Sequence, residues 1–264
     1  MKKNNYKCYF CNSAGAAQIC KNLNFYKCGN CGLYARYPMP SVSELRLIYS
    51  ECYSREKIEF DCTNQLSPKE MHRSLGEYIK TNFLLDQKIN ILDYGSGTGG
   101  LLKELTKYNT SSNYAFNGVE YSESARTKAS IDLGENVFYA EIPRRKYHLV
   151  TMVEVIEHLP KPWEDLKLIF SHMETNSNII ITTPNLGGIN ALLTGCNWRE
   201  QNKSFHLVMF NKSFLKKLLV DAGFKKVEFI RFFPIHEQSF IRKIKSRLLQ
   251  LLGLHGGIFV VAKK

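Results

Sequence analysis

Two cysteine pairs near the N-terminus have the residue types and the spacing of a metal site. Cys8 and Cys11 form one Cys-x2-Cys pair, Cys28 and Cys31 form another, and 16 residues separate the two pairs. Four thiolates at this spacing can form the tetrahedron that Zn²⁺ prefers, and four protein ligands close its coordination shell. We therefore expect a zinc ribbon over residues 1–40 with a structural zinc ion. The alternative, four free thiols, would leave a short segment with little core to fold it.

The other four cysteines have no partner at such a spacing, and we interpret each as an ordinary thiol; they are Cys20, Cys52, Cys62 and Cys196. The residues after Met1 contain no apolar segment of the signal-peptide type, and no apolar run reaches the length of a membrane span. Cysteines in a chain without a secretion signal indicate a reducing compartment. We therefore expect a cytoplasmic protein.

A glycine-rich stretch, Asn90 to Gly100 (NILDYGSGTGG), follows a short apolar run. Its glycines allow the backbone to approach a ligand at points where a Cβ would clash. By itself the stretch is ambiguous, because Gly95, Gly97 and Gly100 also match the G-x-G-x-x-G pattern of dinucleotide sites. Glu120 lies 20 residues beyond Gly100, at a distance where a ribose-binding acid could stand.

The acid that precedes the glycines favours one kind of cofactor over the other. Asp93 stands two residues before Gly95, where a dinucleotide site normally has an apolar residue, because the following helix N-terminus must receive a negative pyrophosphate. An acid in this place suits a cofactor that carries an ammonium and a sulfonium and no phosphate. S-adenosylmethionine (SAM) is such a cofactor.

Segments in and after this stretch resemble the cofactor motifs of class I SAM-dependent methyltransferases. Residues 91–99 resemble motif I of that family. Residues 118–122 resemble its second-strand motif, whose acid, Glu120 here, binds the ribose hydroxyls. Residues 140–143 stand where the family has an acid near the adenine, and Glu141 is the acid in this chain. The resemblance therefore implies a SAM site.

Other segments resemble the quinone O-methyltransferase and small-molecule branch of the same class. Residues 150–159 are similar to its fourth-strand motif, and residues 204–210 and 218–224 are similar to its later part. Residues 28–33 and 40–53 resemble the zinc-ribbon leader attached to some of these enzymes, including sugar C-methyltransferases.

The resemblance also implies which residues contact the cofactor. They come from motif I, from the second-strand motif and from the segments that follow the third and fourth strands. The expected cofactor-binding residues are Asp93, Tyr94, Gly95, Ser96, Gly97, Gly99, Glu120, Tyr121, Glu141 and Glu154.

Two histidines are candidates for the chemistry that such a family performs. Methyl transfer from SAM is an in-line displacement, so the enzyme aligns the acceptor and removes a proton when the acceptor is a hydroxyl or a carbon acid. A histidine suits proton removal because its pKa lies near neutrality. His158 is the first catalytic candidate and His206 the second. The alternative for His158 is that it fixes the loop after the fourth strand by hydrogen bonds.

The elements that must position these residues alternate between strands and helices. Apolar patterns and caps predict strands at 88–93, 114–120, 137–140, 147–153, 178–183, 226–233 and 258–262, and helices at 101–108, 123–133, 163–173 and between Asn211 and Gly223. This order predicts an α/β fold, a Rossmann-like seven-stranded, mostly parallel sheet with helices on both faces. Ser41 and Glu44 form a capping-box pattern in an expected helical connector, 41–70, before a methyltransferase domain at 71–264.

The charge balance bears on the partners. The chain has 36 Lys and Arg against 24 Asp and Glu, a net charge of +12, which favours acidic partners unless the lysines only solvate the surface. The basic, leucine-rich residues 240–254 predict an amphipathic helix that either contacts a membrane surface or a lipid-linked substrate, or packs on its own domain.

We expect a SAM-dependent methyltransferase that methylates an oxygen or carbon atom of a small molecule. The expected acceptors are a sugar, a nucleotide-sugar, a polysaccharide precursor or a quinone-like compound. Two alternatives stay open. One is an RNA methyltransferase that uses the ribbon to bind RNA, disfavoured because the ribbon segment has no dense Lys/Arg cluster. The other is a non-catalytic zinc-ribbon adaptor with a degenerate methyltransferase fold.

Overall fold

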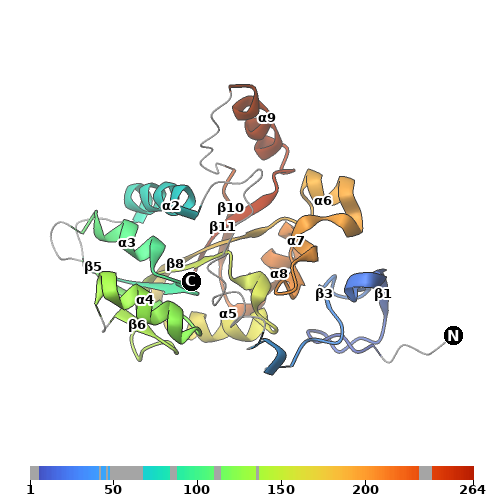
Figure 1. The fold of residues 1–264 in the computed structure, drawn as a ribbon, viewed down its shortest axis with the longest axis horizontal. Helices are drawn as coiled ribbons and strands as arrows, with labels where there is room; N and C mark the ends of the chain where they lie inside the picture. The colour runs from blue at the N-terminus through green and yellow to red at the C-terminus, as the bar shows by residue number, and fades with distance from the viewer. Residues whose placement is uncertain are drawn as a thin grey trace.

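The computed structural model describes residues 6–41, 43–45, 47, 68–83, 88–109, 114–134, 137–231 and 240–264. Within them, seven strands form one sheet in the order β10-β11-β8-β7-β4-β5-β6 (Figure 1). They are β4 (Ile89–Tyr94), β5 (Tyr114–Val119), β6 (Phe138–Tyr139), β7 (Tyr147–Val153), β8 (Met173–Pro184), β10 (Lys226–Phe229) and β11 (Gly257–Lys263). Strands β4 to β8 pair in parallel, whereas β11 pairs antiparallel with both β8 and β10. The predicted seven-stranded, mostly parallel sheet is confirmed.

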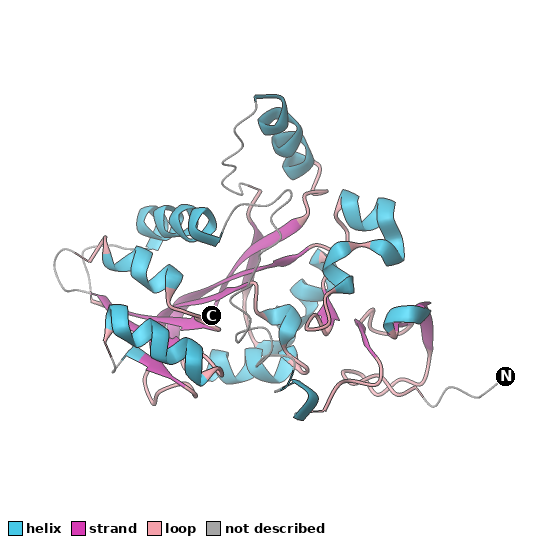
Figure 2. Ribbon diagram, viewed as in Figure 1, coloured by secondary structure: helices cyan, strands magenta, loops and turns pink. Residues whose placement is uncertain are grey.

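The central strands are apolar on both faces because each face is covered by helices (Figure 2). On β8, Ile180 packs into one hydrophobic cluster while its neighbours Ile179 and Ile181 pack into the other. Ile91 and Leu92 divide in the same way on β4. Successive side chains of a strand point to opposite faces, so an uninterrupted apolar run fills two layers of core.

Three helices contribute residues to the cluster that contains Ile180 and Ile91. They are α2 (Pro68–Phe83), α3 (Gly100–Thr106) and α4 (Glu123–Leu133). Two other helices contribute to the cluster that contains Ile179, Ile181 and Leu92. They are α5 (Pro162–Ser171) and α8 (Lys212–Ala222). Helix α8 has the caps that its sequence predicts. The Asn211 side chain accepts a hydrogen bond from the Phe214 N–H at 2.8 Å, and Gly223 is left-handed at φ +112°. The predicted helices on both faces are confirmed.

Several element boundaries differ from the predictions. The sequence patterns did not predict α2, which begins at Pro68, a residue that the first position of a helix tolerates. The helix expected at 163–173 ends at Ser171, and Met173 already pairs with Tyr147 in the sheet. Three further helices lie in the connections between later strands. Helices α6 (Ile189–Thr194) and α7 (Arg199–Asn202) follow β8, and α9 (Phe240–Leu251) precedes β11. No helix in the described ranges is long and apolar enough to cross a membrane.

The N-terminal segment forms a second, four-stranded sheet in the order β1-β2-β3-β9. It consists of β1 (Ala16–Cys20), β2 (Phe25–Cys28), β3 (Tyr34–Arg36) and a late strand of the chain, β9 (Val208–Met209). In Figure 1 the blue N-terminal strands accordingly lie near the orange helices α7 and α8. Phe10 extends this contact, because its ring lies 5.4 Å from Trp163 and 5.9 Å from Phe214. The N-terminal segment and the larger fold therefore share a sheet and a core.

The expected helix start at Ser41 is present as a capping box. The Ser41 N–H donates to Glu44 Oε2 at 2.7 Å, and the Glu44 N–H donates to Ser41 Oγ at 3.3 Å. Residues 43–45 and 47 are helical. Most of the expected connector 41–70 lies outside the described residues, and α2 spans its expected end at residue 70.

Cys20 and Cys196 form a disulfide bond, so their interpretation as ordinary thiols is wrong. Sequence spacing gave no sign of this pair because its members are 176 positions apart in the sequence, and only the packing of β1 beside the turn at Gly195–Asn197 brings them together. Protein disulfides are rare in reducing compartments, so this bond removes the cysteine argument for a cytoplasmic location. Cys52 and Cys62 lie outside the described residues.

Replacing both Cys20 and Cys196 with alanine should lower the free energy of unfolding by about 2–5 kcal/mol, because their bond closes a long loop of the unfolded chain. Urea unfolding with zinc present should show this loss. The phosphine reductant TCEP should lower the wild-type midpoint to that of the variant and leave the variant unchanged. A wild-type midpoint that equals that of the variant without reductant would show that the bond contributes nothing.

Candidate functional site

The glycine loop after β4 follows a path that only glycine can take at several points. Gly95, Gly97 and Gly99 have φ angles of +80°, +52° and +78°, which are unfavourable for other residues. A Cβ on Gly95 would lie 2.3 Å from a methyl carbon of Val155, and a Cβ on Gly99 would lie 2.8 Å from the ring of Phe138. The loop therefore packs tightly against the loop after β7 and against β6.

One side of the same loop is open. A Cβ on Gly97 would meet no described atom within 4 Å. Ser96 is buried, and its Oγ has no hydrogen-bond partner within the described part of the chain. The Ser96 hydroxyl lies against β5, because a Cβ on Gly118 would lie 2.6 Å from its Oγ. The open side of Gly97 therefore leaves room for a ligand next to the loop backbone.

The Glu120 carboxylate holds this loop in place. Glu120 directly follows β5 and is 8% exposed. Its Oε2 accepts a hydrogen bond from the Gly97 N–H at 3.0 Å, and its Oε1 accepts one from the Ser122 N–H at 2.8 Å. Each carboxylate oxygen has a second lone pair, so both can accept another hydrogen bond from a ligand.

Asp93 is buried at the end of β4, where its Oδ1 accepts a hydrogen bond from the Thr151 hydroxyl at 2.7 Å. Burial and the nearby Glu120 charge raise the pKa of Asp93 to about 7, against the lowering effect of the Thr151 hydrogen bond. A cationic ligand next to a buried carboxyl group with a raised pKa would stabilise its ionised form.

The remaining expected cofactor residues lie in different surroundings. The Tyr94 hydroxyl donates to Asp165 Oδ1 at 2.6 Å, and its ring packs in the cluster that α5 and α8 cover. Tyr121 is 77% exposed, and Glu141 is also exposed. Partial burial raises the pKa of Tyr121, as do the charges of Asp165 and Glu141. Tyr121 and Glu141 follow β5 and β6, the two strands beyond β4 in the sheet order.

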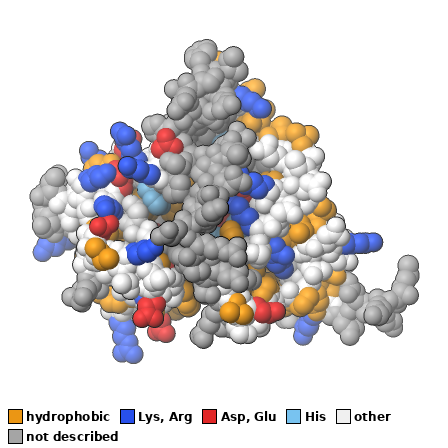
Figure 3. All heavy atoms as spheres, in the orientation of Figure 1, with side chains coloured by type: hydrophobic (Ala, Val, Ile, Leu, Met, Phe, Trp, Pro, Cys, Tyr) orange, Lys and Arg blue, Asp and Glu red, His pale blue; other side chains and the backbone are white. Residues whose placement is uncertain are grey.

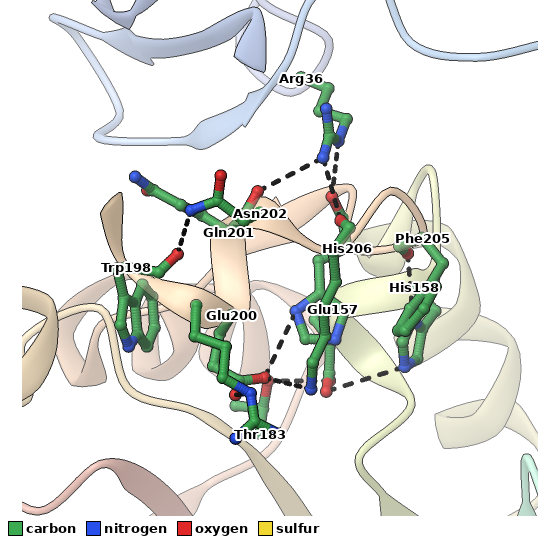
Figure 4. A network of polar contacts seen from close by, with 12 residues as sticks. Arg36, Glu157, His158, Thr183, Trp198, Glu200, Gln201, Asn202, Phe205 and His206 are labelled. Atoms are coloured by element: carbon green, nitrogen blue, oxygen red, sulfur yellow. Dashed lines mark hydrogen bonds and ion pairs between the residues drawn. The ribbon is translucent and has the colours of Figure 1, made fainter. Parts of the chain in front are cut away.

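A second group of polar side chains follows β7, in and next to the short turn η3 (Ile156–His158) (Figure 4). Glu157 is 1% exposed, its Oε2 accepts a hydrogen bond from the Thr183 hydroxyl at 2.9 Å, and burial raises its pKa to about 7. Glu154 adopts a left-handed φ of +53°, a strained conformation that holds the chain where it leaves β7. Burial and the charge of Glu157 raise the pKa of Glu154 to about 8.

The structure brings the two predicted histidines together, with their ring centroids 4.8 Å apart. His158 Nδ1 lies 3.0 Å from the Phe205 carbonyl oxygen, and Nε2 lies 3.9 Å from Glu157 Oε1. Burial lowers the pKa of His158 to about 4 and that of His206 well below its usual value. Both imidazoles are therefore neutral at physiological pH, so each has a nitrogen lone pair.

An arginine from the N-terminal segment fixes the loop that carries His206. Arg36 Nε donates to the His206 carbonyl at 2.8 Å, and its guanidinium also donates to the carbonyls of Lys203 and Leu23, each at 3.0 Å (Figure 4). Sequence reasoning did not assign a role to Arg36, since its partners His206 and Lys203 lie about 170 residues away and no local pattern marks them. It also gave no role to Glu157, although this residue stands inside the quoted fourth-strand motif.

The four cysteines of the N-terminal pairs converge, with sulfur atoms all within 4.8 Å of one another. Cys8 Sγ lies 3.6 Å from Cys31 Sγ, and Cys11 Sγ lies 3.6 Å from Cys28 Sγ. The edge of a zinc–thiolate tetrahedron measures about 3.8 Å, from a Zn–S distance near 2.3 Å. None of the four is in a disulfide. The donor set and its spacing fit a zinc ion.

Comparisons with known proteins bear on the larger fold and its glycine loop. Residues 68–228 match the family model of the methyltransferase domain. The plantazolicin methyltransferase BpumL, solved with a substrate analogue and S-adenosylhomocysteine (SAH), is 18% identical, with a TM-score of 0.53, covering 83% of this chain and 89% of that one. A SAM-dependent methyltransferase from Archaeoglobus fulgidus is 18% identical, with a TM-score of 0.50 and coverage of 73% and 94%.

A protein of Nostoc punctiforme described as an O-methyltransferase is 12% identical, with a TM-score of 0.52. The match covers 73% of this chain but spans only 55% of the length of that protein. No curated protein matches the sequence. At these identities the solved structures show the fold, which is that of SAM-dependent methyltransferases, and the family model covers more than half of the residues. The chain belongs to the methyltransferase-domain family.

Proposed function

We propose that this chain is a SAM-dependent methyltransferase that methylates an oxygen or carbon atom of a small-molecule acceptor. The observation that carries the proposal is the grouping of Asp93, Glu120 and the open side of Gly97 at the carboxyl ends of β4 and β5. Ligands of open α/β sheets bind at this edge. The SAH bound in the plantazolicin methyltransferase supports the choice of cofactor. When bound, SAM supplies a methyl group that its sulfonium activates for attack.

Each residue around the loop would contact a different part of the cofactor. The buried Asp93 carboxylate would face a cationic part of the ligand, since a cation restores its ionised form. The second lone pairs of Glu120 would accept hydrogen bonds from the ribose hydroxyls, and Ser96 and Gly97 would line the cofactor through the backbone of the loop. Tyr121 and Glu141 would border the adenine side.

We assign His158 and His206 to the acceptor side of the site. Val155, whose methyl groups lie against Gly95, is separated from His158 by only two residues. The His158 ring in turn lies 4.8 Å from that of His206. Neutral imidazoles suit an acceptor that must lose a proton before its atom attacks the methyl carbon. The acceptors that we propose are a sugar, a nucleotide-sugar, a polysaccharide precursor or a quinone-like compound.

The N-terminal segment is proposed to be a zinc ribbon over residues 1–40, joined through 41–70 to a methyltransferase domain at 71–264. The convergence of the four cysteine sulfurs supports a structural zinc ion at Cys8, Cys11, Cys28 and Cys31.

We propose that residues 240–254 contact an acidic or lipid-linked acceptor or a membrane surface, and the exposed residues of helix α9 support this proposal. Its residues Ile244, Leu248 and Leu251 are more than half exposed, next to exposed basic residues. Elsewhere, Figure 3 shows Lys and Arg side chains spread over several parts of the visible face, an arrangement that suits solvation more than a continuous RNA track.

Calorimetry with SAM and SAH tests the proposed function. The wild-type protein should bind both, and Asp93→Ala and Glu120→Ala should each weaken binding at least about tenfold, because each removes a buried charged partner. Glu164→Ala, at an exposed residue of α5, is the matched control and should bind as the wild type does. If folded, zinc-loaded wild type binds neither ligand, the proposal fails; NAD binding would then favour a dinucleotide site, and its absence the adaptor alternative.

A further inference from the structure

Exposed apolar side chains gather on two helices outside the candidate site. Of the twelve large hydrophobic side chains that are exposed in the described residues, six lie on α6, on α9 or on the residue after α9, and they are 53–78% exposed. Figure 3 shows hydrophobic side chains over α6, at the upper right of the view. We call this set the α6–α9 surface; it consists of Leu192, Leu193, Ile244, Leu248, Leu251 and Leu252. Single exposed leucines are ordinary, whereas a group of this size indicates an interaction site.

A backbone hydrogen bond joins the two helices at their ends. The Ile189 N–H, at the start of α6, donates to the Leu254 carbonyl at 2.9 Å. Leu252 stands two residues before Leu254, and Leu192 stands three residues after Ile189, a rise of about 4.5 Å along a helix. In Figure 1, α6 and α9 accordingly lie next to each other. The six side chains therefore belong to one region of the protein.

Helix α9 exposes apolar side chains and buries a polar one. Ile244, Leu248 and Leu251 follow one another at intervals of four and three residues, so they share one face of the helix, and all three are exposed. Gln250, by contrast, is only 7% exposed. A helix that packs only on its own domain has the opposite arrangement, with its apolar face buried and its polar face in solvent. Packing on its own domain, the alternative for residues 240–254, therefore does not account for this apolar face.

The charges of the same region indicate the sign of its partner. Residues 240–254 contain four basic residues and no Asp or Glu; they are Arg242, Lys243, Lys245 and Arg247. Lys245 and Arg247 are exposed, and α6 contains no charged residue. Leucines beside basic residues suit a partner that is apolar inside and negative at its surface, as a bilayer with anionic lipids is. A second copy of this chain would instead bring the same positive charges against the surface.

We propose that the α6–α9 surface binds the protein to a bilayer that contains anionic lipids. The six apolar side chains would enter the boundary between headgroups and acyl chains, and the basic residues of α9 would contact the lipid phosphates. Helix α9 has 12 residues and is therefore about 18 Å long, too short for a hydrocarbon core of about 30 Å, so it would lie in the plane of the membrane.

The position of α6 relates this surface to the candidate site. Helix α6 follows the carboxyl end of β8, and the glycine loop and η3 follow the carboxyl ends of the parallel strands β4 and β7. Binding to a membrane through α6 would bring this edge of the sheet toward the lipid. The consequence for the substrate rests on the proposed function: the methyl acceptor is then a lipid-linked molecule whose polar part the membrane presents to the site.

Flotation of the full-length, zinc-loaded protein with lipid vesicles, without SAM, tests the surface. One set of vesicles is phosphatidylcholine alone, and the other contains about 30% of the anionic lipid phosphatidylglycerol. The wild type should float with the anionic vesicles, and added salt should reduce the bound fraction. Leu248→Ser/Leu251→Ser and Leu192→Ser/Leu193→Ser should each weaken binding at least about tenfold, because each removes two side chains that lipid would bury.

Matched controls remove the same kinds of side chain elsewhere. Ile131→Ser/Leu168→Ser removes two exposed apolar side chains from α4 and α5 and should bind vesicles as the wild type does. Lys245→Gln/Arg247→Gln should weaken binding to anionic vesicles about fivefold for each charge. Its control, Lys128→Gln/Lys167→Gln, removes two exposed charges from α4 and α5 and should have little effect.

The same proteins are measured for SAM binding by calorimetry and for folding by circular dichroism. Vesicle binding by a protein that does not bind SAM supports the surface, although the methyltransferase proposal then fails. SAM binding by a wild type that does not bind anionic vesicles overturns the surface and leaves the methyltransferase proposal intact. Folded leucine variants that float as the wild type does overturn the surface as well. A wild-type dimer that binds no vesicles, and that the leucine variants dissociate, would show that the surface joins two copies of the chain instead.

Discussion

Replacement of Cys28 with serine is expected to unfold the N-terminal sheet and to lower the stability of the whole chain by several kcal/mol. Cys28 is 1% exposed and stands at the end of β2, beside the three other cysteines. A structural zinc ion contributes about 10–16 kcal/mol of binding free energy to its folded domain. The loss should reach the larger fold, because β3 pairs with β9 and Phe10 packs on Trp163.

Thermal unfolding and zinc content, measured together, check this expectation. Cys28→Ser should contain less than one zinc ion per chain and unfold at a lower temperature. Cys11→His is the matched control: Cys11 is only partly buried, and histidine is also a zinc ligand, so this variant should retain zinc and most of the stability. Full stability of Cys28→Ser without zinc would show that the segment folds on its hydrophobic contacts alone.

Replacement of Gly97 with alanine is expected to weaken SAM binding about a hundredfold while the protein stays folded. The added methyl group would point into the open side of the loop, where no described atom lies within 4 Å, and would occupy space that the cofactor needs. Such overpacking costs about 1–3 kcal/mol. The left-handed φ of +52° adds a stability cost of about 1–2 kcal/mol, which leaves the fold intact.

Calorimetry with SAM and SAH separates these two effects when a second glycine is used as the control. Gly134 also has a positive φ, +95°, and open space around its Cβ position, but it ends α4 and lies outside the cofactor loop. Gly134→Ala should therefore lose at least as much stability as Gly97→Ala and bind SAM as the wild type does. Equal affinities of Gly97→Ala and wild type would place the cofactor elsewhere.

The N-terminal segment has a structural consequence for the candidate site as well as for stability. Arg36 of β3 holds the carbonyls of Lys203 and His206, and the Leu207 N–H donates to the Glu157 carbonyl at 2.8 Å. One path of hydrogen bonds to the backbone thus runs from the proposed ribbon to the loop that carries His206. This path gives a physical reason for the ribbon to be part of the same chain.

The sequence by itself determined the features that arise within a few residues. Glycines at 95, 97 and 99 predicted a loop that only they can form, and their φ angles agree. Helix α8 begins after Asn211 and ends before Gly223, as the two cap residues predicted, since a cap depends on residues within one turn. The alternation of strand and helix patterns predicted a mostly parallel sheet covered on both faces, because parallel strands need crossover helices between them.

Only the tertiary structure decided which distant residues meet. The Cys20–Cys196 bond, the pairing of β3 with β9 and the convergence of Glu157, His158 and His206 all join segments separated by tens to hundreds of residues. Such contacts depend on how buried surfaces dock, and docking is set by the summed packing of many side chains rather than by any local spacing. The sequence therefore proposed the two histidines as catalytic candidates, and only the fold placed Glu157 beside them.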